Sequence, residues 1–161
     1  MHIPGGIERV LTTKANYFAD FLDYEVYIIL TDGINEKPYY PLSPNIKVIN
    51  LNINFDKLWN QSFSKKIIFY IQKQRIYKHK LKAVLFQIRP DITISLLRRE
   101  VNFITSIKDG SIKLGELHVN KENYRNFEKN ETNLFKKIFS KIWMYSLINH
   151  LRKLDRFVVL T

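Results

Sequence analysis

The sequence contains no cysteine. This absence excludes disulfide bonds, thiolate nucleophiles and cysteine-ligated metal sites, and it fits a reducing compartment. Long apolar runs are also missing, so no segment is predicted to span a bilayer, and the first residues carry no signal-peptide pattern. We therefore expect a cytoplasmic protein that is at most peripheral on the inner face of a membrane.

Acidic residues are scarce relative to basic ones. The chain has 161 residues, with 15 Asp and Glu against 26 Lys and Arg, and a formal net charge of +11. Such a charge attracts nucleic acids, anionic lipids and phosphorylated small molecules without distinguishing among them. The length suits one ordinary domain, and we expect a single domain over 1–161.

Helix-like and strand-like patterns alternate along the chain. Apolar residues at helical spacing predict helices over 7–22, from 62 or 64 to 88, over 98–107 and over 132–151. Runs rich in β-branched and aromatic residues predict strands over 24–30, 45–53, 91–96, 112–118 and 156–161. This alternation predicts an α/β fold, a Rossmann-like parallel sheet with helices on both faces.

Two adjacent glycines, Gly5 and Gly6, precede the first predicted helix in the stretch "IPGGIERV". Main-chain N–H groups at a helix N-terminus suit an anion such as a phosphate. The alternative is a tight turn that needs positive φ. Since a glycine turn of this kind normally follows a strand and only three residues precede Pro4, we expect a first strand that is truncated here.

Polar side chains gather where two predicted strands end. Arg98 and Arg99 follow "DITISLL", while Glu116 and His118 lie at the end of "IKLGELH". Parallel sheets bind ligands at the carboxyl ends of their strands, and guanidinium groups suit a phosphate or carboxylate. The alternatives are a solvated loop for the arginines, a buried paired carboxylate for Glu116 and a surface loop for His118.

The segments "PGGIERV", "YEVYIIL", "RPDITISL" and "IKLGELHVN", in this order, resemble the N-terminal domain of family 4 glycosyltransferases, the retaining enzymes of the GT-B fold. The resemblance covers nearly the whole chain. It implies one Rossmann-like half of a GT-B fold, the half that mainly holds the acceptor. The donor-binding half of that family carries an E-x7-E motif, and no pair of glutamates here has that spacing.

The resemblance also implies roles for particular residues. His118 would contact the donor sugar near the reacting carbon, and Gly5 and Gly6 would lie where a diphosphate or acceptor approaches the backbone. By their own chemistry and strand-end position, and not by the resemblance, Arg98 and Arg99 would bind a phosphate or carboxylate of the acceptor, and Glu116 would orient His118 or an acceptor hydroxyl. The partners would be a nucleotide sugar, as co-substrate, and a saccharide or lipid-linked acceptor, with no metal and no other cofactor. We expect the chain to be inactive without its donor-binding half.

Basic residues concentrate in the second predicted helix. The stretch 64–90 has eight Lys and Arg and no acid. An ordinary helix with solvated lysines explains this, and so does an anionic membrane surface, which we favour because many polysaccharide-building enzymes use lipid-linked acceptors. The alternative function is a non-catalytic basic α/β domain that binds nucleic acid, although no nucleic-acid-binding motif is present. The absence of G-x-G-x-x-G argues against a dinucleotide-binding enzyme.

Overall fold

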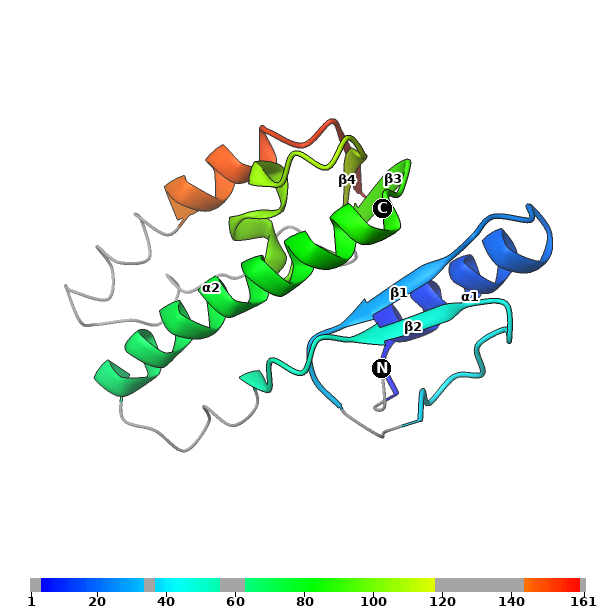
Figure 1. The fold of residues 1–161 in the computed structure, drawn as a ribbon, viewed down its shortest axis with the longest axis horizontal. Helices are drawn as coiled ribbons and strands as arrows, with labels where there is room; N and C mark the ends of the chain where they lie inside the picture. The colour runs from blue at the N-terminus through cyan, green and yellow to red at the C-terminus, as the bar shows by residue number, and fades with distance from the viewer. Residues whose placement is uncertain (1–3, 34–36, 56–62, 118–143, 160–161) are drawn as a thin grey trace. The chain divides into compact units, whose positions relative to one another are not determined.

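The computed structural model describes residues 4–33, 37–55, 63–117 and 144–159. The chain divides into two compact units, Met1–Lys80 and Leu81–Thr161, coloured blue to green and green to red in Figure 1. The predicted α/β fold with parallel strands is confirmed, since each pair of neighbouring strands is parallel. The described strands form two small sheets, ordered β1-β2 and β3-β4-β5. The single domain over 1–161 stays a prediction, as does its place as half of a GT-B enzyme.

The first unit begins with helix α1 (Gly6–Asp20), which packs on the sheet of β1 (Tyr27–Leu30) and β2 (Lys47–Asn50) (Figure 1). The helix buries small residues at i, i+3 and i+7, namely Thr12, Ala15 and Ala19. Ala15 and Ala19 pack against Ile28 and Ile46. Small side chains let the helix axis approach the sheet closely, which leaves the larger Tyr17 52% exposed on the outer side.

The connection from β1 to β2 is pinned to α1 by side chains. The amide of Asn16 donates to the carbonyl of Pro41 at 3.0 Å and accepts from the N–H of Ser43 at 2.9 Å. The hydroxyl of Ser43 donates to the carboxylate of Asp20 at 2.5 Å. These bonds satisfy loop groups that have no sheet partner, so the loop can return the chain for a parallel pairing.

The backbone after β2 is held by the first part of helix α2 (Phe63–Ile88). Phe55, 2% exposed, packs against the rings of Tyr70 and Tyr77. The ammonium of Lys73 donates to the carbonyls of Ile53 and Asn54, and that of Lys80 donates to the carbonyl of Leu51 at 2.7 Å. Two of the lysines in this basic helix therefore have structural roles.

The second unit contains β3 (Ile92–Ser95), β4 (Ile112–Leu117), β5 (Arg156–Val159) and a helical segment over 144–151. Its core consists of Leu97, Val101, Leu117 and Leu147, with Met144, Leu151 and Leu154 packed against them. The helical segment thus covers the carboxyl end of β4 and the turn that follows β3.

The segment predicted as a helix over 98–107 is different in the structure. It forms two 3-10 turns, η2 (Glu100–Asn102) and η3 (Ile104–Ser106). Phe103 lies between them with φ −147° and ψ −10°, which breaks the helical run. Packing explains the difference, because Val101, Phe103 and Ile104 are all buried and a continuous helix could not point all three inward. The expected remnant of a first strand, at residues 1–3, lies outside the described residues.

Candidate functional site

The carboxyl ends of β3 and β4 form the candidate site. The strands are neighbours, and Ser95, the last residue of β3, pairs with Gly115. Beyond this pair the chain continues into Arg98 and Arg99 from β3 and reaches Glu116 on β4. The topology therefore brings these three predicted residues to the same edge of the second sheet, as the sequence analysis expected.

The turn after β3 is organised by Glu100. Its carboxylate accepts hydrogen bonds from the hydroxyl of Ser95 at 2.8 Å and from the main-chain N–H of Arg98 at 3.0 Å. The hydroxyl of Ser95 in turn accepts from the N–H of Leu97 at 3.1 Å. These bonds fix the backbone from which the arginine side chains extend.

Leu97 occupies the left-handed region within this turn, with φ 54°. This conformation costs a residue with a Cβ about 1–2 kcal/mol. The side chain is only 1% exposed and lies in the core of the second unit. Burial of the leucine and the three hydrogen bonds of the turn offset the strain, so the direction of the chain at Arg98 is set by packing.

The site residues differ in exposure. The side chain of Arg98 is exposed, that of Arg99 is half-buried and Glu116 is 5% exposed. An exposed guanidinium can reach an anionic ligand, while a buried carboxylate can orient a neighbouring group. His118 lies outside the described residues, so its position relative to Glu116 is a prediction.

Gly5 and Gly6 lie in the first unit, at the start of α1. Gly5 is the N-terminal cap of the helix in an extended conformation, with φ −158°, so the alternative of a positive-φ turn is wrong. A Cβ on Gly5 would collide with the carboxylate of Glu8, whereas a Cβ on Gly6 would have nothing within 4 Å. The group that lies against Gly5 is thus an acid of the first helical turn, where it interacts favourably with the helix dipole.

Three features were not recognised in the sequence. The first is Glu100, whose two hydrogen bonds depend on the bend at Leu97 and leave no local signal in the sequence. Gly115 permits close packing inside β4, since a Cβ there would lie 2.6 Å from Leu154 and 2.9 Å from Leu97. A glycine inside a strand is a signal for such an approach. The third is Lys113, a lysine only 5% exposed.

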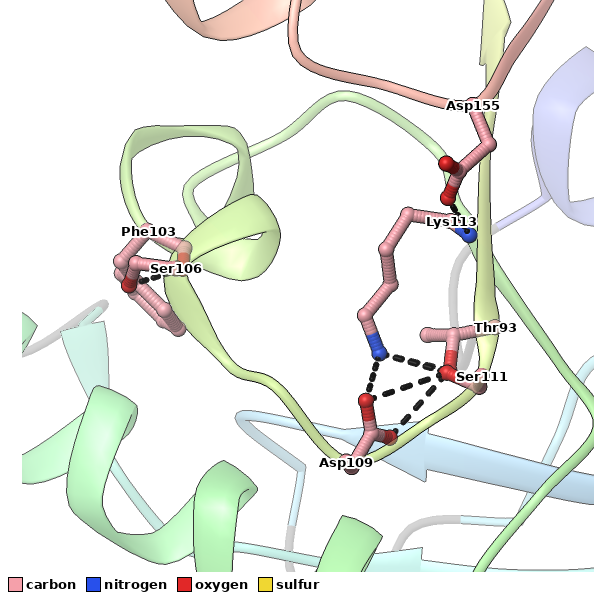
Figure 2. A network of polar contacts seen from close by, with 7 residues as sticks. All are labelled: Thr93, Phe103, Ser106, Asp109, Ser111, Lys113 and Asp155. Atoms are coloured by element: carbon pink, nitrogen blue, oxygen red, sulfur yellow. Dashed lines mark hydrogen bonds and ion pairs between the residues drawn. The ribbon is translucent and has the colours of Figure 1, made fainter.

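Lys113 belongs to a polar network at the opposite edge of the same sheet, shown in Figure 2. Its ammonium forms an ion pair with Asp109 and hydrogen bonds with the hydroxyls of Ser111 and Thr93. Burial alone would raise the pKa of Asp109, but the hydrogen bond and charge of Lys113 outweigh it and hold that pKa below its ordinary value of 3.8.

Comparisons with known proteins add no assignment: no family model, no curated protein and no solved structure matches the chain. Among the described residues, no group of three or more His, Asp or Glu side chains could hold a metal ion. Within the same parts of the chain, no helix combines the length and apolar character needed to cross a bilayer.

Proposed function

We propose that this chain is the acceptor-binding half of a retaining glycosyltransferase, which transfers a sugar from a nucleotide-sugar donor to a hydroxyl acceptor in polysaccharide or glycolipid biosynthesis. The proposal rests on the ordered motifs of the sequence. The observation that carries it is the placement of Arg98 and Arg99 just after β3 and of Glu116 near the end of β4, at the carboxyl edge of a parallel sheet. That edge is where open α/β sheets bind their ligands.

In this proposal Arg98 binds a phosphate or carboxylate of the acceptor, and Glu116 orients an acceptor hydroxyl or His118. His118 contacts the donor sugar and helps to position it. Gly5 would admit a donor diphosphate only if the carboxylate of Glu8 turned away, because two anions at the same helix end repel each other. Because the carboxylate of Glu8 already lies at this helix end, we expect the acceptor, and not the donor, to be the principal ligand of the chain.

The acceptor would be presented at an anionic membrane surface. On α2, the large apolar side chains of Ile68, Phe69 and Ile76 are 58%, 42% and 50% exposed. Arg75 and Lys78 are exposed on the same helix, and no acid occurs over 64–90. Exposed apolar side chains with cations beside them suit the interface of an anionic bilayer.

Calorimetric titration of the chain with saccharides tests the function. We expect saccharides that carry a phosphate or carboxylate to bind and neutral ones to bind more weakly. Arg98→Ala should weaken binding by roughly 10- to 100-fold, the value of a charge-assisted hydrogen bond, while Arg98→Lys should retain part of it. Arg152→Ala, an exposed arginine elsewhere in the second unit, serves as the matched control, and circular dichroism confirms that each variant is folded.

Three outcomes would contradict the proposal. The first is the absence of binding to any anionic saccharide, and the second is an equal loss in Arg152→Ala. The third is a single-stranded oligonucleotide that binds more tightly than any saccharide and depends on Arg98, which would favour the nucleic-acid-binding alternative. The same titrations with nucleotide sugars should show no release of nucleoside diphosphate, because the donor-binding residues of the family are not recognised in this chain.

A further inference from the structure

A pocket of about 340 Å³ opens at the amino edge of the β3-β4-β5 sheet, at the end opposite the candidate site. Lys108, Gly110, Ser111, Lys113, Lys153 and Asp155 contribute to its lining. Ser111 directly precedes β4 and Asp155 directly precedes β5. The pocket is thus formed by the loops that enter two neighbouring strands of the second unit.

The two carboxylates near this pocket are already engaged. Asp109 is paired with the buried ammonium of Lys113 and also accepts from the hydroxyl of Ser111 at 3.1 Å (Figure 2). Asp155 accepts the main-chain N–H of Lys113 at 2.7 Å, and its own N–H donates to the carbonyl of Lys113 at 3.0 Å. These contacts fix Lys113 and Asp155 in the lining of the pocket, and the charge of Lys113 is balanced by that of Asp109.

Two lysines of the pocket are not engaged in this way. The side chains of Lys108 and Lys153 are exposed, and within the described parts of the chain neither ammonium has a hydrogen-bond or ion-pair partner. The charges of Lys113 and Asp109 cancel each other. The two positive charges of Lys108 and Lys153 then outnumber the one negative charge of Asp155. The pocket therefore carries a net positive charge.

The loop that carries Lys108 and enters β4 leaves room for a ligand. Gly110 has φ 93°, and a Cβ placed on it would meet nothing within 4 Å. The volume of about 340 Å³ is many times the ~10–15 Å³ that a cavity needs in order to hold one water molecule. A phosphate group and part of the molecule that carries it fit into such a space.

We propose that this pocket, which Lys113 and Asp155 also line, binds a phosphate group held by the ammonium groups of Lys108 and Lys153. Lysine is a common partner of phosphate as a flexible point charge. The site is distinct from the acceptor site at the carboxyl edge and does not depend on the function proposed there. Free phosphate esters and phospholipid headgroups present the same group.

The test compares the chain with the double variant Lys108→Ala/Lys153→Ala. Inorganic phosphate is titrated calorimetrically against a sodium chloride control of equal ionic strength, and sedimentation with phosphatidylglycerol vesicles forms the second arm. We expect the double variant to bind at least about tenfold more weakly in one arm or both. Lys37→Ala/Arg152→Ala removes two exposed cations that lie outside both the pocket and α2, and this matched control should behave as the unaltered chain does in both arms.

The two arms distinguish a free phosphate compound from a lipid headgroup as the source of the phosphate. Binding of inorganic phosphate that depends on the two lysines supports the proposal with a free phosphate compound as the source. Vesicle binding alone that depends on them supports it with a lipid headgroup as the source. Equal behaviour of the unaltered chain and the pocket variant in both arms overturns the proposal, as does an equal loss in the Lys37→Ala/Arg152→Ala control.

Discussion

The carboxylate of Glu100 accepts the hydroxyl of Ser95 across the turn that follows β3, with 2.8 Å between the two oxygens. The same oxygen accepts the main-chain N–H of Arg98 at 3.0 Å. One acidic side chain therefore closes the turn from which Arg98 extends. If the arginine binds an acceptor, Glu100 acts as a positioning residue through this turn, without touching the ligand.

Removal of this carboxylate should destabilise the second unit. Glu100→Ala leaves the hydroxyl of Ser95 and the N–H of Arg98 without this acceptor, so we expect the free energy of unfolding to fall by about 1–3 kcal/mol in urea titrations. Glu100→Gln keeps an oxygen at the same place and should cost much less. Equal losses in the two variants would show that the charge of Glu100, and not its acceptor oxygen, holds the turn.

A methyl group on Gly115 should overpack the core. Gly115→Ala places a Cβ within 3 Å of Leu154 and Leu97, and we expect a loss of about 1–3 kcal/mol in the free energy of unfolding. Gly6→Ala is the matched control, because its Cβ meets nothing within 4 Å, and it should be neutral or stabilise by up to about 1 kcal/mol. A Gly115→Ala variant as stable as the unaltered chain would contradict the close packing.

The ion pair of Asp109 and Lys113 should make stability depend on pH. The folded-state pKa of Asp109 is lowered from 3.8, so its contribution is present above that value and is lost as the pH falls through the folded-state pKa. Asp109→Asn leaves a buried ammonium without its charge partner and should cost about 3–5 kcal/mol at neutral pH. In urea titrations, the stability difference between the unaltered chain and this variant should shrink below about pH 4.

A second variant guards against failure of Asp109→Asn to fold. Asp109→Asn/Lys113→Met removes both charges and should be more stable than the single variant, because no buried charge is left unpaired. A stability difference between the unaltered chain and Asp109→Asn that stays constant from neutral to acid pH would show that the pair contributes no pH dependence.

The exposed face of α2 should bind anionic vesicles. We expect sedimentation with phosphatidylglycerol vesicles and none with phosphatidylcholine vesicles, and the binding should weaken as salt rises. Arg75→Gln/Lys78→Gln should weaken it by about 30-fold at low salt, on an estimate of about 1 kcal/mol for each cation at the surface. Arg152→Gln/Arg156→Gln is the control with the same change of charge. An equal loss of vesicle binding in this control would show that net charge, and not the face of α2, causes the binding.

The sequence by itself determined the alternation of helices and strands. The described bounds of α2 and of β3, β4 and β5 lie within a few residues of those predicted, because apolar periodicity and breakers such as Pro90 are local signals. The sequence also predicted the strand-end positions of Arg98, Arg99 and Glu116. These positions share one edge of the sheet because parallel strands place their carboxyl ends together. His118 remains a prediction on the same reasoning.

Only the tertiary structure decided which side chains meet. The small residues Ala15 and Ala19 of α1 are buried while the larger Tyr17 is exposed, because the distance between the helix and the sheet depends on the partner strands. The place of Glu8 against Gly5, the strained turn at Leu97 and the pairing of Lys113 with Asp109 arise from backbone conformation and burial. A sequence does not distinguish a charged residue that is solvated from one that is buried. Only packing removes water from the charge, and the loss of that water makes a partner necessary.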